Sequence, residues 1–298
     1  MSSKVVVFGD VSLDTNVKVY ELPVGRHGDV SYVTNGVNDH VGGSAMNVAF
    51  ALRKMGVDVH FVSVTGNDFA GRFISDHLDG IGFEPKRLFT DWENTARSVN
   101  LVSPDGTRYI LHDSKQAMNY EMPISYYEDL LTHGTIVHCS VVNWTRHILK
   151  EAKRRGLVTC TDLHTGFDIN GYHRDFVENA DIVFFSAQNL PHWQEMGHRL
   201  LTMGPGMAIC TRGAQGCAVF RRKFYKEFPA ENFTTDIVDS VGAGDAMAGV
   251  YLGCFSKGMN LDECITRAQI SGLYACTVSG SDSCYMDIEM LEEVVNRK

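Results

Sequence analysis

A short glycine-rich motif near the carboxyl-terminal end has residue types suited to phosphate chemistry. It reads DSVGAGDA over residues 239–246, follows an extended run at residues 235–238 and opens a run of helix formers. The first backbone N–H groups of a helix are unpaired and carry partial positive charge, and the small residues Gly242, Ala243 and Gly244 leave them open to a phosphate. Asp245 would repel that phosphate, so we expect this acid to contact the hydroxyl group that attacks it. Taken alone, the motif equally fits an ordinary helix cap with an acid in its first turn.

A second motif, GGSAMN over residues 42–47, precedes another helical run. Gly42 and Gly43 permit close backbone approach to a ligand, and Ser44 is a candidate cap for the helix. Asn47 lies one turn further on, where its amide offers a donor and an acceptor to a polyol. The alternative is a Gly-Gly turn followed by a solvent-facing amide. Asp14, in GDVSLD after the first strand, is either a second acceptor for sugar hydroxyls or a turn cap.

Two common nucleotide motifs do not fit. The spacing Gly242-x-Gly244 lacks the third glycine of a dinucleotide fingerprint, because Met247 stands there, and the chain has no Walker A loop.

The elements that must position these residues alternate between apolar strands and helices. Fully apolar strands separated by helices predict a mostly parallel sheet with helices on both faces. We expect strands over residues 5–8, 57–64, 135–141, 158–163, 182–185, 207–211 and 217–220. Helices are expected over residues 44–55, 69–80, 125–132, 145–155, 243–257, 261–278 and 287–296. Asp162 and His164 follow one strand, at the edge where such sheets bind ligands.

Two segments, residues 15–40 and 95–113, alternate polar and apolar residues instead. The dipeptide Asp105-Gly106 within the second is a strong hairpin signal. We interpret the two segments as a small β-lid on a single domain over residues 1–298; the alternative is an ordinary edge hairpin.

Composition limits the classes of partner. The 298 residues carry 27 Lys+Arg and 36 Asp+Glu, a net charge of −9, which argues against nucleic acid and anionic membranes as partners. No apolar run is long enough to span a bilayer. The eight cysteines form no Cys-x-x-Cys pair, so we predict neither a cysteine-ligated zinc site nor a dense disulfide framework, and a reducing cytoplasmic location.

In order and spacing, these motifs resemble the paired signatures of the PfkB/ribokinase family of sugar and nucleoside kinases. The first signature runs from Gly42 to Gly66 and the second from Asp239 to Asp245, with TRGAQG over residues 211–216 as a further likeness. The resemblance extends over nearly the whole chain, from Gly9 to Gly280.

The resemblance implies a ribokinase-like three-layer α/β/α fold with a β-lid and ATP-dependent phosphorylation of a sugar hydroxyl. It assigns the catalytic base to Asp245 and the anion hole to Gly242, Ala243 and Gly244. By the same matching, the substrate contacts are Asp14, Gly42, Gly43 and Asn47, and the nucleotide-binding residues are Thr211, Gly213 and Gly216. Arg97, on a lid strand, is a further candidate substrate-binding residue. It either contacts an anionic group of the substrate or is a solvated lid residue.

The chain also departs from the family. Ser186-Ala187-Gln188-Asn189 stands where many members have an Asn-x-x-Glu motif associated with Mg²⁺, so we expect Mg²⁺ to be held mainly by the nucleotide phosphates and water. Some relatives bind a monovalent cation such as K⁺ at carbonyls near Asp239 and Gly280, and lids in this family often pair between subunits, which predicts a homodimer. Alternatives to a sugar kinase are a nucleoside kinase, a sugar- or nucleotide-binding regulator without catalysis, and a nicotinamide-dependent oxidoreductase.

Overall fold

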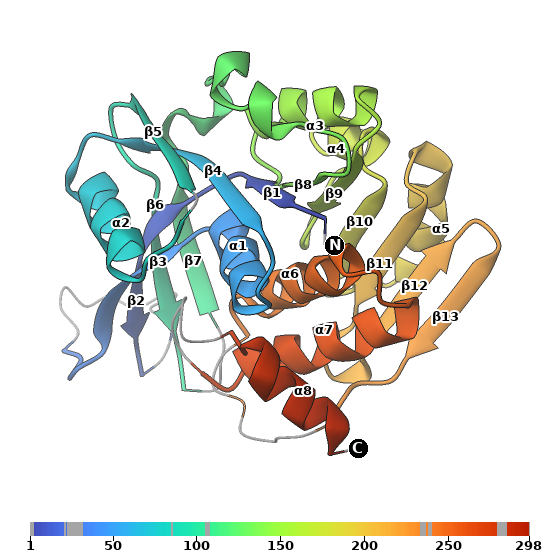
Figure 1. The fold of residues 1–298 in the computed structure, drawn as a ribbon. Coiled ribbons are helices and arrows are strands. Elements are labelled where there is room, and N and C mark those ends of the chain that lie inside the picture. Colours follow the sequence, from blue (N-terminus) through green and yellow to red (C-terminus); the bar gives the residue numbers. More distant parts are fainter. Residues whose placement is uncertain are drawn as a thin grey trace.

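A nine-stranded sheet forms the centre of the molecule (Figure 1). The structure is a computed structural model that describes residues 3–20, 22, 32–84, 86–104, 108–232, 237, 240–278 and 285–297. The strand order is β13-β12-β11-β10-β9-β8-β1-β4-β5. Seven adjacent strands of this sheet (β5, β4, β1, β8, β9, β10 and β11) pair in parallel, and β12 and β13 join one end in antiparallel orientation. The strand bounds are β1 (Val5–Phe8), β4 (Val59–Gly66), β5 (Lys86–Trp92), β8 (Ile136–Cys139), β9 (Val158–Asp162), β10 (Ile182–Ser186), β11 (Met207–Thr211), β12 (Cys217–Arg221) and β13 (Phe224–Phe228).

Helices cover both faces of this sheet because its strands are apolar on both sides. In β1, Val5 and Val7 pack into one core and Val6 and Phe8 into another, as the two-residue period of a strand requires. The first core is closed by α1 (Ser44–Lys54), α2 (Phe69–Gly80), α6 (Ala243–Ser256), α7 (Leu261–Ala275) and α8 (Ile288–Asn296). The opposite face is covered by α3 (Thr145–Arg154), α4 (Arg174–Glu178) and α5 (Trp193–Met203). The predicted three-layer fold with a mostly parallel sheet is confirmed.

A second sheet of four strands, here called the small sheet, lies beside the first in the order β3-β2-β6-β7 (Figure 1). Its strands are β2 (Ser12–Lys18), β3 (Val37–Gly42), β6 (Arg97–Val102) and β7 (Arg108–Asp113). They come from the two segments with alternating polarity, and β6 pairs antiparallel with β7, as a hairpin requires. The turn at Asp105-Gly106 lies outside the described residues.

The two faces of the small sheet differ in polarity. The register places Asp14, Ser98 and His112 side by side on one face, next to the hydrogen-bonded pair Asn16 and Asn100. The other face carries the polar residues Thr15, Asp39, Arg97 and Asp113, and it also exposes four apolar side chains, Val37, Val99, Tyr109 and Leu111. We refer to these four residues as the apolar patch.

Several predicted elements differ from the structure. The helix expected over residues 125–132 is wrong: two short 3₁₀ turns, Ile124–Tyr126 and Glu128–Leu130, stand there because Tyr127 turns inward and packs its ring edge-to-face on Phe8. Helices α4 and α5 and strands β5 and β13 were not predicted. The extended run at residues 235–238 lies outside the described residues, apart from Ile237.

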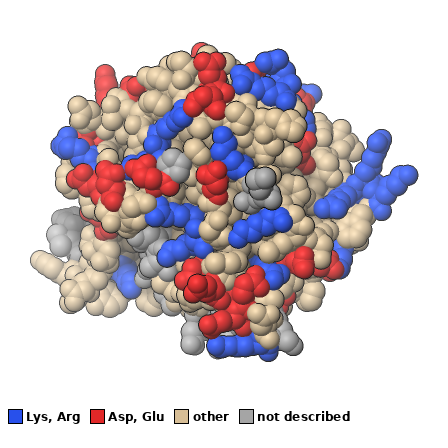
Figure 2. All heavy atoms as spheres, viewed as in Figure 1, with Lys and Arg blue, Asp and Glu red and all other residues tan. Residues whose placement is uncertain are grey.

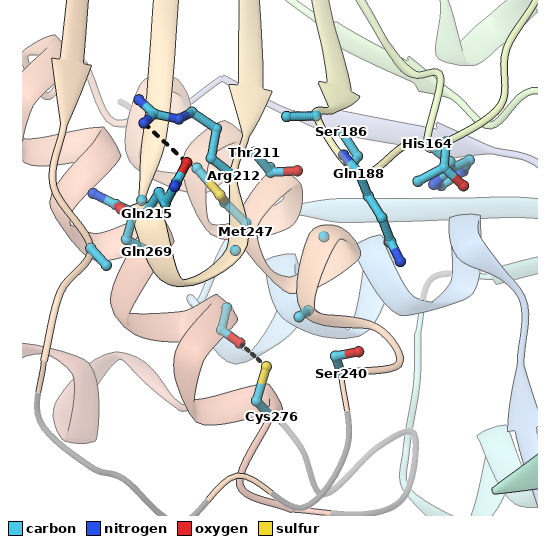
Figure 3. A pocket seen from close by; sticks show the side chains of 18 of the residues that line it. His164, Ser186, Gln188, Thr211, Arg212, Gln215, Ser240, Met247, Gln269 and Cys276 are labelled. Atoms are coloured by element: carbon cyan, nitrogen blue, oxygen red, sulfur yellow. Dashed lines mark hydrogen bonds between the residues drawn. The ribbon is translucent and has the colours of Figure 1, made fainter. Parts of the chain in front are cut away.

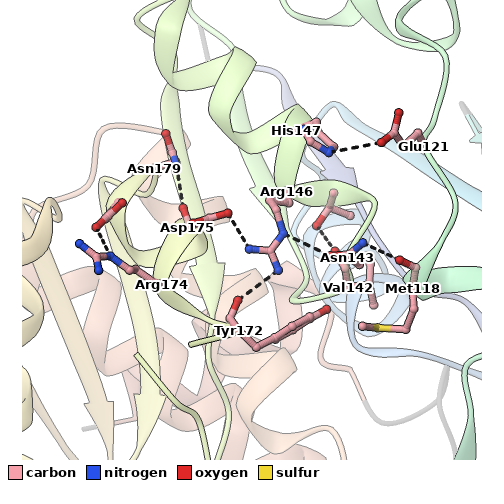
Figure 4. Close-up of polar contacts among 12 residues, drawn as sticks. Met118, Glu121, Val142, Asn143, Arg146, His147, Tyr172, Arg174, Asp175 and Asn179 are labelled. Atoms are coloured by element: carbon pink, nitrogen blue, oxygen red, sulfur yellow. Dashed lines mark hydrogen bonds and ion pairs between the residues drawn. The ribbon is translucent and has the colours of Figure 1, made fainter. Parts of the chain in front are cut away.

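A polar cluster ties α3 to α4 and to the segment that follows the small sheet (Figure 4). The Arg146 guanidinium donates to Asp175 at 2.8 Å, to the Tyr172 carbonyl at 3.1 Å and to Asn143 at 3.2 Å. Asn143 in turn donates to the Met118 carbonyl at 2.6 Å. These bonds fix the outer helical layer to the connection that leaves β7.

The surface is mixed in charge. On the face shown in Figure 2, basic and acidic side chains are interspersed over the described residues. None of the described helices combines the length and apolar character that a membrane crossing needs. The seven cysteines within the described residues form no disulfide bond with one another. The cytoplasmic location stays a prediction.

Candidate active site

Asp245 lies in the first turn of α6 and is held by two side chains from α1. Ser44 Oγ donates to Asp245 Oδ1 and Asn47 Nδ2 donates to Asp245 Oδ2, both at 2.8 Å. The Asp245 residue is 9% exposed. Each of its oxygens keeps a second lone pair, so the group can still accept a proton or a hydroxyl hydrogen bond. The acid is thus held in one orientation, and its oxygens can still accept further hydrogen bonds.

The contact between α1 and α6 depends on a glycine. A Cβ added to Gly249 of α6 would lie 2.6 Å from the Ala51 Cβ of α1. Only a residue without a side chain lets the helices approach this closely, and this approach brings Ser44 and Asn47 to Asp245.

Burial dominates the electrostatics of the acid. It raises the pKa of Asp245 to about 6, while His164 and the hydrogen bonds from Asn47 and Ser44 act in the opposite direction. A position in the first turn of a helix favours the ionised form of an acid, but here desolvation outweighs this effect. The carboxylate still remains mostly ionised at neutral pH.

The start of α6 has the geometry expected of an anion-binding turn. Gly242 is the cap residue with φ of 77°, a left-handed conformation that favours glycine, and no side chain caps the helix. Gly242, Ala243, Gly244 and Asp245 all line one cavity of about 1100 Å³. The Ala243 N–H donates to the Ser240 carbonyl at 3.4 Å. The other N–H groups of this first turn lie close to a space large enough for a nucleotide.

The start of α1 differs from the prediction. Ser44 does not cap the helix; the Asp10 carboxylate does, by accepting the N–H groups of Ser44 at 2.9 Å and Ala45 at 3.3 Å. Gly43 adopts φ of 103° against the Asp10 backbone. A Cβ on Gly42 would lie 2.1 Å from Asp14 Oδ2. Both glycines therefore have a packing role that the motif alone did not reveal.

Asp14 and Arg97 occupy different faces of the small sheet. Asp14 accepts from Ser12 Oγ at 2.6 Å and lies against Gly42, close to the start of α1, but it does not line the cavity. Arg97 pairs with Leu13, so it points to the opposite face, where it is exposed. The structure does not bring Arg97 together with Asp14 or Asp245.

The loop after β11 closes the far end of the same cavity. Thr211, Gly213 and Gly216 all line it, and Figure 3 shows Thr211 with Arg212 and Gln215 on one side and Cys276 on the other. Gly216 has φ of 86°, and a Cβ there would lie 2.1 Å from the Phe228 carbonyl. The loop can therefore turn sharply only with glycine at this position.

Asp162 and His164, at the end of β9, complete the inner wall of the cavity. His164 Nε2 lies 3.3 Å from Ser44 Oγ, and His164 Nδ1 lies 3.7 Å from Asp162 Oδ2. Burial alone would lower the pKa of His164, but the carboxylates of Asp162, Asp245 and Asp10 raise it above the ordinary value. The position of both residues after a strand predicted that they would face a ligand cleft, but it did not predict this link to Asp245.

The stretch Ser186–Asn189 also lines the cavity, with Gln188 reaching inward from the end of β10 (Figure 3). It supplies hydroxyl and amide groups but no carboxylate. These residues do not fit direct Mg²⁺ ligation of the carboxylate type. The residues proposed near a monovalent cation, Asp239 and Gly280, lie outside the described residues.

Comparison with known proteins identifies the family. Residues 2–288 match the pfkB family carbohydrate kinases. The chain is 29% identical over 293 residues to acarbose 7(IV)-phosphotransferase of an Actinoplanes species, with 95% of each chain covered. It is 27% identical over 264 residues to aminoimidazole riboside kinase of Salmonella typhimurium, covering 79% of this chain and 80% of the other.

Solved structures agree. A microbiome-derived acarbose kinase superposes with a TM-score of 0.90 at 28% identity, with both chains covered completely. Ribokinase of Arabidopsis thaliana, solved with ribose and ATP, superposes with a TM-score of 0.82 at 18% identity, covers 99% of each chain and shows the shared ribokinase fold. The chain therefore belongs to the pfkB family of carbohydrate kinases and is a phosphotransferase whose acceptor is an alcohol group.

Proposed function

We propose that this kinase transfers the γ-phosphoryl group of ATP to a hydroxyl group of an uncharged, polyhydroxylated sugar or sugar derivative. The observation that carries this proposal is the position of Asp245. It is held by Ser44 and Asn47 at an open helix start, in the same cavity as the Thr211–Gly216 loop. The two relatives that act on acarbose support a carbohydrate acceptor.

In this mechanism Asp245 orients the acceptor hydroxyl and takes its proton as the oxygen attacks the γ-phosphorus. The bond to the leaving ADP oxygen breaks as the new P–O bond forms. The N–H groups at Gly242, Ala243 and Gly244 hold the negative charge of the transferred group, which passes through a loose transition state in which positioning and charge stabilisation dominate. Thr211, Gly213 and Gly216 bind the nucleotide. Mg²⁺ would be held by the nucleotide phosphates and water, and would neutralise part of the phosphate charge.

The acceptor side favours a neutral sugar over a sugar phosphate. The face of the small sheet that carries Asp14 also holds Ile110 and several polar residues, which offer hydroxyl, amide and imidazole groups: Ser98, Asn16, Asn100, His40 and His112. Arg97, which would have suited an anionic substrate, faces the other way. We infer that Asp14 and the backbone at Gly42 and Gly43 contact sugar hydroxyls, and that the small sheet acts as a lid on one kinase domain.

We also propose that the chain forms a homodimer through the apolar patch on that lid. Val37, Tyr109 and Leu111 are each more than half exposed there, and exposed apolar clusters of this kind mark association surfaces.

The direct test is an acceptor panel of neutral mono- and oligosaccharides, including acarbose, together with sugar phosphates and nucleosides. Each is incubated with ATP and Mg²⁺, and ADP formation is measured. We expect acceptor-dependent ADP formation with a neutral carbohydrate. A preference for nucleosides would show that the acceptor is a nucleoside and not a carbohydrate. ADP formation that needs no acceptor would contradict the proposal.

A further inference from the structure

Two acids and an imidazole meet at the inner end of the cavity. Asp162, His164 and Asp245 each offer one oxygen or nitrogen, and these three atoms all lie within 4.8 Å of one another. We propose that these side chains form a binding site for a first-row transition-metal dication such as Zn²⁺, and that metal bound there switches the kinase off.

The three side chains are already fixed in place. The Asp162 Oδ1 accepts the backbone N–H of His164 at 2.8 Å, which closes a tight turn after β9. Within that turn His164 has φ of 55°, a left-handed conformation that is uncommon for residues other than glycine and clusters at functional sites. Asp245 is oriented by Ser44 and Asn47. Outer contacts of this kind orient metal ligands and strengthen binding.

The local charge favours a cation. Asp162 is 5% exposed and Asp245 is nearly as buried, and Asp10 lies close enough to influence His164 as well. Among the described residues that line the cavity, the one lysine or arginine is Arg212, and it pairs with Glu227. Buried carboxylates need a compensating partner, and a dication would neutralise two of them at once.

A second imidazole on the same sheet face as Asp162 independently indicates that the site binds a polar ligand. His138 of β8 is fully buried, and neither of its ring nitrogens has a hydrogen-bond partner among the described residues. It pairs with Cys160 of β9, so it lies on the same sheet face as Asp162, two residues earlier. Buried polar groups without partners are rare. A metal site with its water would give this imidazole polar neighbours.

The donor set separates this metal from the Mg²⁺ of the nucleotide. Imidazole together with carboxylates suits zinc, manganese and their neighbours, whereas Mg²⁺ prefers oxygen ligands and keeps its water. A metal ligated by Asp245 takes up the lone pairs that would receive the acceptor proton. Inhibition should therefore be relieved by the acceptor sugar, which competes for Asp245, and not by additional Mg²⁺ and ATP.

The test measures metal binding on the full chain without nucleotide or acceptor. Zn²⁺ is titrated calorimetrically into the wild type, Asp162→Asn and His164→Gln, with His192→Gln as the matched control because this exposed histidine lies outside the cavity. We expect one Zn²⁺ per wild-type and control chain, and affinity at least about tenfold weaker in the two site variants. Co²⁺ absorption should show a nitrogen ligand that His164→Gln removes. Millimolar Mg²⁺ should not displace Zn²⁺.

Unchanged Zn²⁺ affinity in both site variants would overturn the proposal, as would equal competition by Mg²⁺. His164→Gln tests it even if Asp162→Asn fails to fold, because the His164 side chain is 43% exposed. The readout does not depend on the acceptor: a protein that binds Zn²⁺ through these residues but phosphorylates no carbohydrate would refute the proposed function and leave the metal site standing.

Discussion

The cavity around Asp245 and the small sheet are built in different ways. In the cavity, the side chains that can act lie at strand ends or in the first turn of a helix, and each is tied to a second element, as Asp245 is to α1. On the small sheet, candidate ligand contacts lie along the length of the strands on one face, and the other face carries the exposed apolar patch.

This difference separates chemistry from recognition. Phosphoryl transfer needs groups held in one geometry, which buried helix and strand ends provide. Recognition of different sugars needs a surface that can change without disturbing the core. Variants in the cavity should therefore change kcat, whereas variants on the small sheet should change acceptor KM or association.

Asp245→Asn should give the largest effect. The amide cannot take the acceptor proton, and loss of a general base typically costs about 10²–10⁴-fold in rate. Nucleotide affinity, measured by calorimetry, should change little, since the N–H groups of the α6 start remain. A kcat within a few-fold of wild type would contradict the assignment of Asp245 as the general base.

Asn47→Ala and Asn100→Ala compare two buried amides, one in each region. Asn47 donates to a carboxylate, and a hydrogen bond to a charged group contributes about 1.5–3 kcal/mol, so kcat/KM should fall about 10- to 100-fold. Asn100 donates to Asn16 at 2.8 Å within the small sheet. Its loss should raise acceptor KM and leave kcat within about twofold. Equal losses of kcat in both variants would contradict the proposal that the cavity determines kcat and the small sheet determines acceptor KM.

The sequence predicted the residues of the cavity better than it predicted the contacts that hold those residues in place. The strands of the central sheet were predictable because they are apolar on both faces, and the family resemblance assigned Asp245 to catalysis and the Thr211 loop to nucleotide binding. The contacts of Ser44 and Asn47 with Asp245 join residues about two hundred positions apart, and no local pattern encodes such a pairing. For the same reason the capping of α1 by Asp10 was not foreseen.

Elements at the periphery were missed because their apolar pattern is weak. β5 and β13 are edge strands that mix charged and apolar residues. Helix α5 buries only Gly197 and Leu200, too few for a clear helical period. In these elements tertiary packing, rather than local sequence, decides the structure.

The pH dependence of kcat/KM should report the burial of Asp245. Because its pKa is raised to about 6, the base is ionised above this value and protonated below it. The rate should be level at higher pH and fall about tenfold per pH unit on the acid side. The profile is measured with a zinc-selective chelator present. A decline centred near the ordinary aspartate pKa would show that the free enzyme does not desolvate this acid.

Leu111→Lys tests whether the small sheet mediates association. Leu111 is 54% exposed within the apolar patch, while its neighbour Ile110 is 45% exposed on the opposite face and serves as the matched control. In sedimentation experiments, the wild type and Ile110→Lys should be dimers and Leu111→Lys a monomer, because a buried lysine charge opposes pairing. A monomeric wild type would contradict the proposed homodimer.

Asp68→Asn should have the smallest effect, on the junction between the two regions. Asp68 caps α2 by accepting the Gly71 N–H at 2.9 Å, and it also accepts the Thr95 hydroxyl at 2.6 Å and the Thr95 N–H at 3.0 Å, just before β6. Burial alone would raise the pKa of Asp68, but the bonds from Thr95 and Gly71 hold it below its ordinary value.

The variant should lose about 1 kcal/mol of unfolding free energy at neutral pH, measured by urea denaturation, with kcat unchanged. Because the pKa of Asp68 is lower in the folded state, its contribution is complete above the ordinary aspartate pKa and is lost as the pH falls through the folded value. The stability difference between wild type and variant should therefore narrow as the pH falls below the ordinary aspartate pKa. A constant difference over this range would mean that the charge of Asp68 does not hold the junction, and that the small sheet is anchored by its other contacts.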